Sequence, residues 1–172
     1  ARGYTLAEAI AGAPDLVVIA PNDPVAMCEL AEECAERRVP FMFDPSQQVI
    51  WLDADFLRFG AERCQILIVN EYEWAMIAKK TGLTREDLVD AGKTLIVTHG
   101  SEGSHLYAGG EHIVVPVFPV ARVADPTGVG DAYRAGFLSG LAWGVSLERA
   151  AQVGCMLATL VIETVGTQEY QL

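Results

Sequence analysis

Two glycines and a carboxylate lie close together in the segment Asp125-Pro126-Thr127-Gly128-Val129-Gly130-Asp131. Apolar residues follow it at helical spacing, so we expect the segment to lead into the N-terminus of a helix. Free backbone N–H groups and the helix dipole favour an anion at such an end. Asp131, in the first turn, could accept a proton from an attacking hydroxyl while the backbone holds a phosphoryl group. The pattern indicates phosphoryl transfer, with a helix cap as the alternative role of Asp131.

This segment lacks the marks of two common phosphate-binding motifs. A P-loop needs a lysine followed by serine or threonine after its last glycine, and this chain has neither there. A dinucleotide-binding fingerprint needs a third glycine, and Tyr133 takes its position. A phosphate site at this helix is therefore of another kind.

The pattern Asp125-x-Thr127-Gly128-x-Gly130-Asp131 resembles the signature of the ribokinase-like (PfkB) carbohydrate and nucleoside kinases. Val129 replaces the usual alanine, a mild change because the backbone forms the phosphate cradle. The resemblance implies that ATP is the co-substrate and that Mg²⁺ accompanies it. It makes Asp131 the catalytic base, in contact with the acceptor substrate, and makes Gly128, Val129 and Gly130 an anion hole. It also leaves open a monovalent cation such as K⁺ near Asp125.

Polar residues after two predicted strands resemble further motifs of this family. Asn70 and Glu73 match an Asn-x-x-Glu motif that orders magnesium and the phosphates, with Glu73 acting largely through water. Thr98, Gly100 and Gly103 match a Thr-x-Gly-x-x-Gly loop near the phosphates of ATP. Without the resemblance, Asn70 is a helix cap with a favourable acidic first turn, and the glycine loop is a hairpin.

The loop from Asp44 to Gln48 follows a predicted strand, at the kind of sheet edge where α/β proteins bind ligands. Sugar kinases of the family carry Asp-x-Asn-x-Arg in this loop, whereas this chain has Ser46 and Gln48 in place of the Asn and Arg. Losing the arginine disfavours an anionic acceptor, and Gln48 could hydrogen-bond a neutral ribose or purine edge. The loop and residues 163–170 are more similar to bacterial adenosine kinases of the family. An ordinary polar turn is the alternative.

Strands alternating with helices must position these residues, and the alternation predicts an α/β domain. We expect strands at residues 16–20, 41–43, 66–69, 93–98, 104–108 and 111–118, and helices at residues 5–11, 24–38 and 70–80, after Gly130 and from Ser146 to Ile162. The sheet is predicted to be mostly parallel, with antiparallel strands at residues 104–118. The resemblance implies one three-layer ribokinase-like domain over residues 1–172, without the N-terminal acceptor-binding half and its lid. We therefore expect the isolated segment to be inactive.

The composition narrows the classes of partner. The chain has 172 residues, 51% of them hydrophobic, and a formal net charge of −11. It is long enough for a sizeable core, and its charge disfavours nucleic acid and anionic membranes as partners. The sequence shows no signal peptide or membrane-length apolar run, and its four cysteines have no zinc-binding spacing. We expect buried, reduced thiols in a cytoplasmic protein.

The resulting hypothesis is ATP-dependent phosphoryl transfer to the 5′-hydroxyl of adenosine or a similar nucleoside, which yields AMP and ADP and serves purine salvage. Within the same class, a ribose or fructose kinase is the alternative. From a different class, a non-catalytic nucleotide-binding module remains open, because the acceptor-binding half is missing from these residues. A homodimer also remains open.

Overall fold

The computed structural model of the chain describes residues 5–9, 12 and 14–170, which fall into two compact units. Unit 1 lies within residues 1–98 and 107–111, and unit 2 within residues 99–106 and 112–172. Unit 1 holds α1 (Leu6–Ala9), β1 (Val17–Ile19), α2 (Pro24–Arg37), β2 (Phe41–Phe43), the 3₁₀ helix η1 (Ser46–Ile50), α3 (Ala54–Arg63), β3 (Ile66–Asn70), α4 (Glu71–Thr81), α5 (Arg85–Asp90) and β4 (Thr94–Thr98). Unit 2 holds the 3₁₀ helix η2 (Gly100–Glu102), α6 (Val129–Ala142) and α7 (Leu147–Ile162), while β5 (Ser104–Ala108) and β6 (Glu111–Val115) contribute to both units.

The strands form one six-stranded sheet in the order β1-β2-β3-β4-β5-β6. Strands β1 to β4 run parallel to one another, and the remaining pairs are antiparallel. The parallel strands are runs of β-branched, aliphatic and aromatic residues, the composition that a buried parallel sheet requires. The predicted α/β class with a mostly parallel sheet is confirmed.

The core of unit 1 joins one face of these strands to their connecting helices. Side chains alternate between the two faces of a strand, and every second residue of β2 and β3, such as Phe43 and Leu67, belongs to this core. The helices contribute Met27, Ala31 and Cys34 from α2, Phe56, Leu57 and Ala61 from α3, and Trp74 and Ile77 from α4. This packing fixes the carboxyl ends of the strands, where the predicted site residues of unit 1 follow.

Several predicted boundaries needed correction. Strand β6 ends at Val115 rather than at residue 118, because Pro116 has no N–H group for a further ladder bond. Helix α3 was not predicted, although Asp53 caps it by accepting a hydrogen bond from the N–H of Phe56 at 2.8 Å. Helix α5 was missed as well. In the first predicted helix, residues 6–9 are helical, and residues 10 and 11 lie outside the described residues.

The cysteines and the helices can be compared with the predictions of reduced thiols and of no membrane span. All four cysteines are free, and burial raises the pKa of Cys34 to about 11 and that of Cys64 to about 12. Cys28 is only half-buried. None of the helices described for this chain combines the length and the apolar character that a bilayer span needs.

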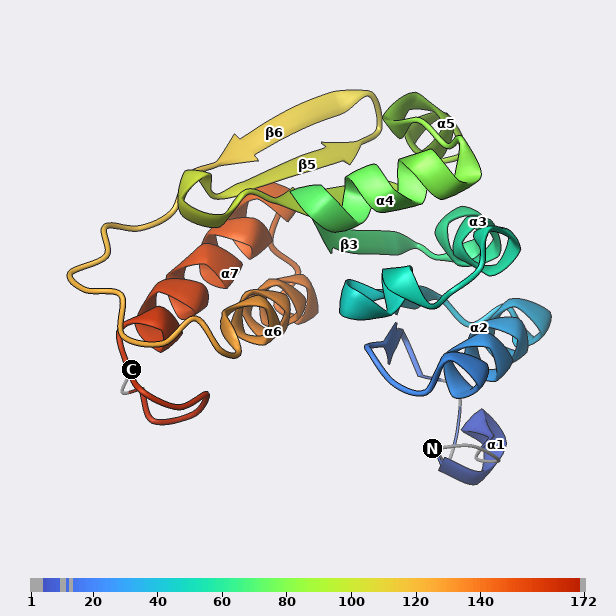
Figure 1. Ribbon diagram of the computed structural model, residues 1–172, viewed down its shortest axis with the longest axis horizontal. Helices are drawn as coiled ribbons and strands as arrows, with labels where there is room; N and C mark the ends of the chain where they lie inside the picture. The colour runs from blue at the N-terminus through green and yellow to red at the C-terminus, as the bar shows by residue number, and fades with distance from the viewer. Residues whose placement is uncertain (1–4, 10–11, 13, 171–172) are drawn as a thin grey trace. The chain divides into compact units, whose positions relative to one another are not determined.

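In unit 2, helices α6 and α7 lie side by side (Figure 1) and touch through small residues. A Cβ atom at Gly136 would lie 2.7 Å from the carbonyl oxygen of Val153, and one at Gly140 would lie 2.6 Å from the Cα atom of Ala150. Both distances are shorter than a van der Waals contact. Larger side chains at these glycines would therefore force the two helices apart.

A buried hydroxyl pair connects α6 to the start of β5. The hydroxyl of Tyr133 donates a hydrogen bond to Oγ of Ser104 at 2.8 Å, and both side chains are buried. The Sγ atom of Cys155, on α7, lies 3.9 Å from the same Oγ. Burial raises the pKa of Tyr133, so its hydroxyl keeps the proton that this bond needs. The contact ties the first turns of α6 to the residue that follows Gly103.

We expect Tyr133→Phe to lower the free energy of unfolding by about 1–2 kcal/mol, because the Ser104 hydroxyl stays buried and loses its best partner. Chemical denaturation of the intact protein measures this effect. The matched control is Tyr72→Phe, since Tyr72 is 62% exposed. Equal stability of the two variants would show that the hydroxyl pair contributes nothing.

Candidate functional site

The predicted phosphate cradle begins a helix as expected. Gly128 is the N-cap of α6, with a left-handed φ of 80° and no side-chain capping bond. Helix geometry gives the first N–H groups, including those of Gly130 and Asp131, no intrahelical acceptor. Asp131 is the third residue of the helix and is not its cap. The capping alternative for this aspartate is therefore ruled out, and the N-terminus of α6 presents backbone donors beside a carboxylate.

The two glycines of the cradle differ in what they contact. A Cβ atom at Gly128 would lie 2.7 Å from Cγ2 of Thr167, and its φ is already unfavourable for other residues. A Cβ atom at Gly130 would have no atom of the chain within 4 Å. Glycine costs a helix up to about 1 kcal/mol relative to alanine. The fold explains why position 128 is a glycine. The packing of the chain does not explain the glycine at position 130, which has open space beside it.

The carboxylate of Asp131 is paired with a cation that sequence reasoning missed. Oδ1 of Asp131 accepts a hydrogen bond from Nη2 of Arg134, one turn further along α6. The Asp131 side chain is 74% exposed, whereas the Arg134 side chain is only 12% exposed, and burial lowers the pKa of Arg134. The i,i+3 spacing of an acid and a base in a predicted helix could have revealed this pair.

Asp125 closes the turn before the cradle. Its Oδ1 accepts the N–H of Thr127 at 2.9 Å, and its Oδ2 accepts the N–H of Gly166 at 3.4 Å. The hydroxyl and N–H of Thr127, followed by the N–H of Gly166, hold the pKa of Asp125 below its usual range. Because Thr167 also lies against Gly128, the structure brings the C-terminal tail of residues 163–170 beside the cradle.

The loop of Gly100 and Gly103 is the predicted hairpin. The N–H of His99 donates to the carbonyl oxygen of Gly103 at 2.8 Å, and η2 makes the turn between them. Gly103 has a φ of 102°, and a Cβ atom there would lie 2.0 Å from the carbonyl oxygen of Val115. Gly103 is thus required by packing, and Gly100, with no atom within 4 Å of its Cβ direction, is not.

In unit 1, the residues Asn70 and Thr98 are direct partners at the carboxyl ends of β3 and β4. Asn70 caps α4, and its Oδ1 accepts the N–H of Glu73 at 2.9 Å. In return, Oε2 of Glu73 accepts the N–H of Asn70 at 2.7 Å, which completes a capping box. The hydroxyl of Thr98 donates to the carbonyl oxygen of Val69 at 3.5 Å.

The donors and acceptors here fit a hydrated Mg²⁺ better than a directly bound one. The capping bond uses Oε2 of Glu73, so Oε1 can accept a hydrogen bond from a water molecule of the ion. Burial raises the pKa of Glu73, and a nearby cation would offset that cost. Among the described residues, no cluster of three or more His, Cys, Asp or Glu is placed to hold a metal. Mg²⁺ usually keeps several waters and takes few carboxylates.

The predicted acceptor loop forms a 3₁₀ helix over most of its length. After Asp44, the chain enters η1 with Ser46 at a φ of 43°. The Ser46 hydroxyl donates to Oε1 of Gln47 at 2.7 Å, so part of the Gln47 amide is already used. The Gln48 side chain is half-buried and the Gln47 side chain is exposed. Gln48 is thus the better candidate to contact a substrate.

Lys80, near the C-terminus of α4, holds this loop in place. Its Nζ donates to the carbonyl oxygens of Val49, Ile50 and Leu52, at 2.7, 3.1 and 2.8 Å. All three ammonium hydrogens can be used in these bonds. One helix therefore carries the capping box of Asn70 at its start and a clamp on the acceptor loop at its end.

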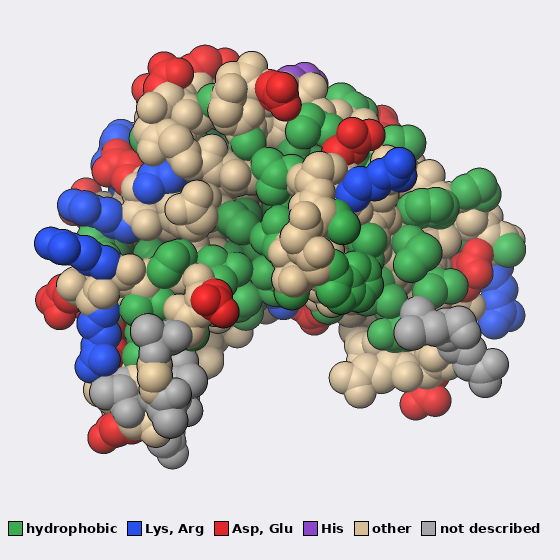
Figure 2. Space-filling view, turned by 180° about the vertical axis from the view of Figure 1, so that it is seen from behind, with side chains coloured by type: hydrophobic (Ala, Val, Ile, Leu, Met, Phe, Trp, Pro, Cys, Tyr) green, Lys and Arg blue, Asp and Glu red, His purple; other side chains and the backbone are tan. Residues whose placement is uncertain are grey.

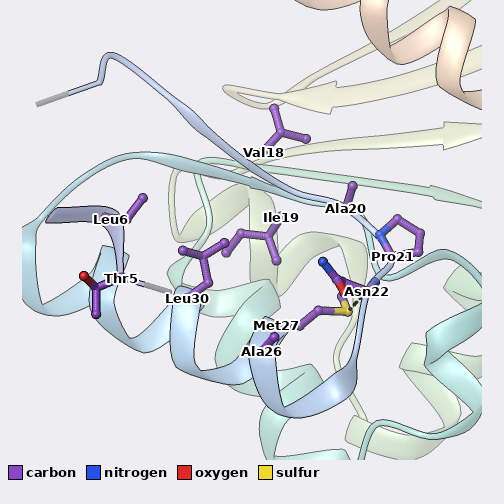
Figure 3. A pocket seen from close by; sticks show the side chains of 10 residues that line it. All are labelled: Thr5, Leu6, Val18, Ile19, Ala20, Pro21, Asn22, Ala26, Met27 and Leu30. Atoms are coloured by element: carbon purple, nitrogen blue, oxygen red, sulfur yellow. Dashed lines mark hydrogen bonds between the residues drawn. The ribbon is translucent and has the colours of Figure 1, made fainter. Parts of the chain in front are cut away.

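Two cavities of unit 1 are lined by residues outside the predicted site. The one drawn in Figure 3 has a volume of about 310 Å³ and is lined by side chains of α1, β1 and α2 and of the segment between β1 and α2. A second, of about 300 Å³, is lined by Arg38, Arg63 and Lys93 among others, and Lys and Arg side chains gather along one side of the chain in Figure 2. Neither contains a residue predicted to bind ATP or the acceptor.

Comparison with known proteins establishes the family. Residues 5–171 match the pfkB family of carbohydrate kinases, and the chain belongs to this family. A nucleoside kinase of Methanocaldococcus jannaschii is 32% identical over 154 residues, which cover 90% of this chain and 51% of that protein. The chain thus spans about half the length of the curated relatives it matches.

Solved structures agree with this assignment. The nucleoside kinase of Burkholderia thailandensis in complex with inosine superposes with a TM-score of 0.88 at 32% identity, over 93% of this chain and 54% of that one. The adenosine kinase from Sinorhizobium meliloti gives a TM-score of 0.69 at 28% identity, over 83% of this chain and 45% of that one. The predicted resemblance to ribokinase-like kinases, and to part of such a chain, is confirmed.

We expect Lys80→Met to loosen η1, because three carbonyl groups lose their ammonium partner. Amide hydrogen exchange at Trp51 and Leu52 should accelerate at least about tenfold, as expected for losing roughly 1.4 kcal/mol of local stabilisation. The control is Lys79→Met, an exposed neighbour on the same helix. Unchanged exchange at both amides in Lys80→Met would contradict the clamp.

Proposed function

We propose that the protein containing this chain is an ATP-dependent kinase that phosphorylates the 5′-hydroxyl of adenosine or a similar nucleoside, giving AMP and ADP. The observation that carries the proposal is the N-terminus of α6. There a glycine cap, open space beside Gly130 and the exposed carboxylate of Asp131 occur together. Membership of a kinase family and similarity to nucleoside kinases support the choice of reaction.

In the proposed reaction, the acceptor hydroxyl attacks the γ-phosphorus of ATP. A new oxygen–phosphorus bond forms, the bond to the β,γ-bridging oxygen breaks, and ADP leaves. Asp131 accepts the hydroxyl proton, and Gly128, Val129 and Gly130 form the anion hole that stabilises the charge on the transferring phosphoryl group. The N–H of Val129 also donates to the carbonyl oxygen of Pro126 at 3.4 Å, so the N–H groups of the two glycines contribute most. Because this transition state is loose, positioning and charge neutralisation matter more than the strength of the base.

The remaining predicted residues would serve the nucleotide. We propose that Asn70 and Glu73 orient the waters of Mg²⁺, which neutralises charge on the phosphates, and that Thr98, Gly100 and Gly103 line the path of the phosphates. Asp125 could attract a monovalent cation such as K⁺, because it keeps its negative charge. These roles rest on the family motif together with the local geometry of each residue.

For the acceptor, we favour a nucleoside over a sugar. The loop lacks the arginine that would suit an anionic acceptor, and Gln48 can donate to and accept from a neutral partner. The structure of the relative solved with inosine shows a nucleoside bound by a protein of this type. A sugar kinase remains the second candidate because the family is one of carbohydrate kinases.

The cellular setting of the proposed enzyme follows from more general arguments. Free, mostly buried cysteines suit a reducing compartment such as the cytoplasm. A role in purine salvage and a homodimeric assembly stay predictions. We expect the isolated 172 residues to be inactive, because the motifs matched in them do not include the acceptor-binding half expected from the family.

The deciding experiment measures ATP consumption by the intact protein with Mg²⁺ and adenosine, inosine, ribose or fructose. Turnover with adenosine alone would support the adenosine kinase proposal, and turnover with a sugar would replace the acceptor. Mg·ATP binding without transfer to any of the four would favour a non-catalytic module. Asp131→Asn should keep ATP binding and lose at least about 10²-fold in kcat, whereas the exposed Asp15→Asn should not. A near wild-type rate for Asp131→Asn would exclude it as the base.

Alanine substitutions at the two cradle glycines should affect stability and activity differently. Gly130→Ala should leave the free energy of unfolding unchanged or raise it by up to about 1 kcal/mol, yet lower kcat at least about tenfold, because its methyl group enters the space proposed for the phosphoryl group. Gly128→Ala should lower the stability by more than about 1 kcal/mol. Thermal unfolding and initial rates measure both. Full activity of Gly130→Ala would show that the space beside it is not used.

A further inference from the structure

We propose that Arg134 is the positioning residue for Asp131: its largely buried side chain holds the carboxylate in the orientation that accepts the proton of the substrate hydroxyl. This inference rests on the proposed role of Asp131. The direct observation is the hydrogen bond from Nη2 of Arg134 to Oδ1 of Asp131. The bond uses Oδ1, so Oδ2 can face an incoming hydroxyl.

The exposure of the two partners distinguishes this pair from an ordinary surface ion pair. In the pair of Arg58 and Glu62 on α3, both side chains are exposed, to 45% and 46%. Here the Arg134 side chain is 12% exposed, whereas the Asp131 side chain is 74% exposed. The cation is the more buried partner, and the carboxylate is the exposed one. Burial fixes the guanidinium, which then limits the rotamers available to Asp131.

The free-energy cost of this arrangement also points to a function. Burying a guanidinium removes it from water, and this desolvation has a free-energy cost. The neighbouring residues of α6, such as Tyr133 and Phe137, are buried and mostly apolar. A methionine or leucine at position 134 would fill the same place without that cost. Retaining an arginine there is explained if Asp131 must be held still during phosphoryl transfer.

The proposal predicts a specific kinetic pattern in the intact enzyme. Arg134→Met keeps an unbranched stem but removes the guanidinium, and it should lower kcat about 10²-fold, the cost of a misplaced catalytic group. The KM values for ATP and for the acceptor should change by no more than roughly twofold, because substrate binding does not use Arg134. Arg134→Lys, which keeps the positive charge but not the planar guanidinium, should have a kcat between those of Arg134→Met and the wild type. Arg149→Met is the matched control, since Arg149 makes an i,i+3 contact with Gln152 on α7.

A double-mutant cycle tests whether Arg134 acts through Asp131. If it does, Asp131→Asn with Arg134→Met should be no slower than Asp131→Asn alone. Additive losses, or a raised KM for ATP, would show instead that Arg134 contacts the phosphates, and would overturn the inference. Equal kcat values for Arg134→Met and wild type would overturn it too. If Asp131→Asn itself remains active, the proposed function of Asp131 has failed, a result that the single variant reports independently of Arg134.

Discussion

The close contact of α6 with α7 is the constraint on which the candidate site in unit 2 depends. Small residues let the two backbones approach: a Cβ atom at Gly154 would lie 2.8 Å from the carbonyl oxygen of Tyr133. Helices packed this closely cannot slide or rotate without a clash. The hydroxyl of Tyr133 adds a hydrogen bond to Ser104, at the start of β5. The first turn of α6 is therefore held by the packing of the turns that follow it, and a loop alone could not give it that precision.

The chain before the cradle is restrained from the other side. Asp125 binds the N–H groups of Thr127 and Gly166, and Thr167 packs against Gly128. The C-terminal tail thus packs against the turn, although the two segments are far apart in the sequence. The same contacts leave the Cβ direction of Gly130 open. Contacts within the chain thus restrain the cradle at Asp125 and Gly128, whereas Gly130 faces open space.

Local signals made the strands, the cradle and the capping box predictable, and tertiary contacts explain what was missed. Asn70 and Glu73 are three residues apart, so their capping box is visible in the sequence. Lys80 contacts a carbonyl group 31 residues away in the sequence, and no periodicity reveals such a contact. Arg134 follows Asp131 at the i,i+3 spacing of a helical ion pair, but its burial depends on the packing of α6. Sequence motifs can therefore indicate the groups proposed to react. The residues that hold those groups in place are recognised only once the packing of the helices is known.

Capping and catalysis need not be competing explanations of the same residue. In Glu73, the capping bond fixes Oε2 and so also fixes the direction of Oε1. Burial raises the pKa of this carboxyl, so the folded state becomes less stable as the pH rises and the buried group must ionise. A hydrated cation beside Oε1 would favour the ionised form and remove that cost. The helix cap thus orients the Glu73 carboxylate. Its ionised form is disfavoured by burial and would be stabilised by the Mg²⁺ that the proposed reaction requires.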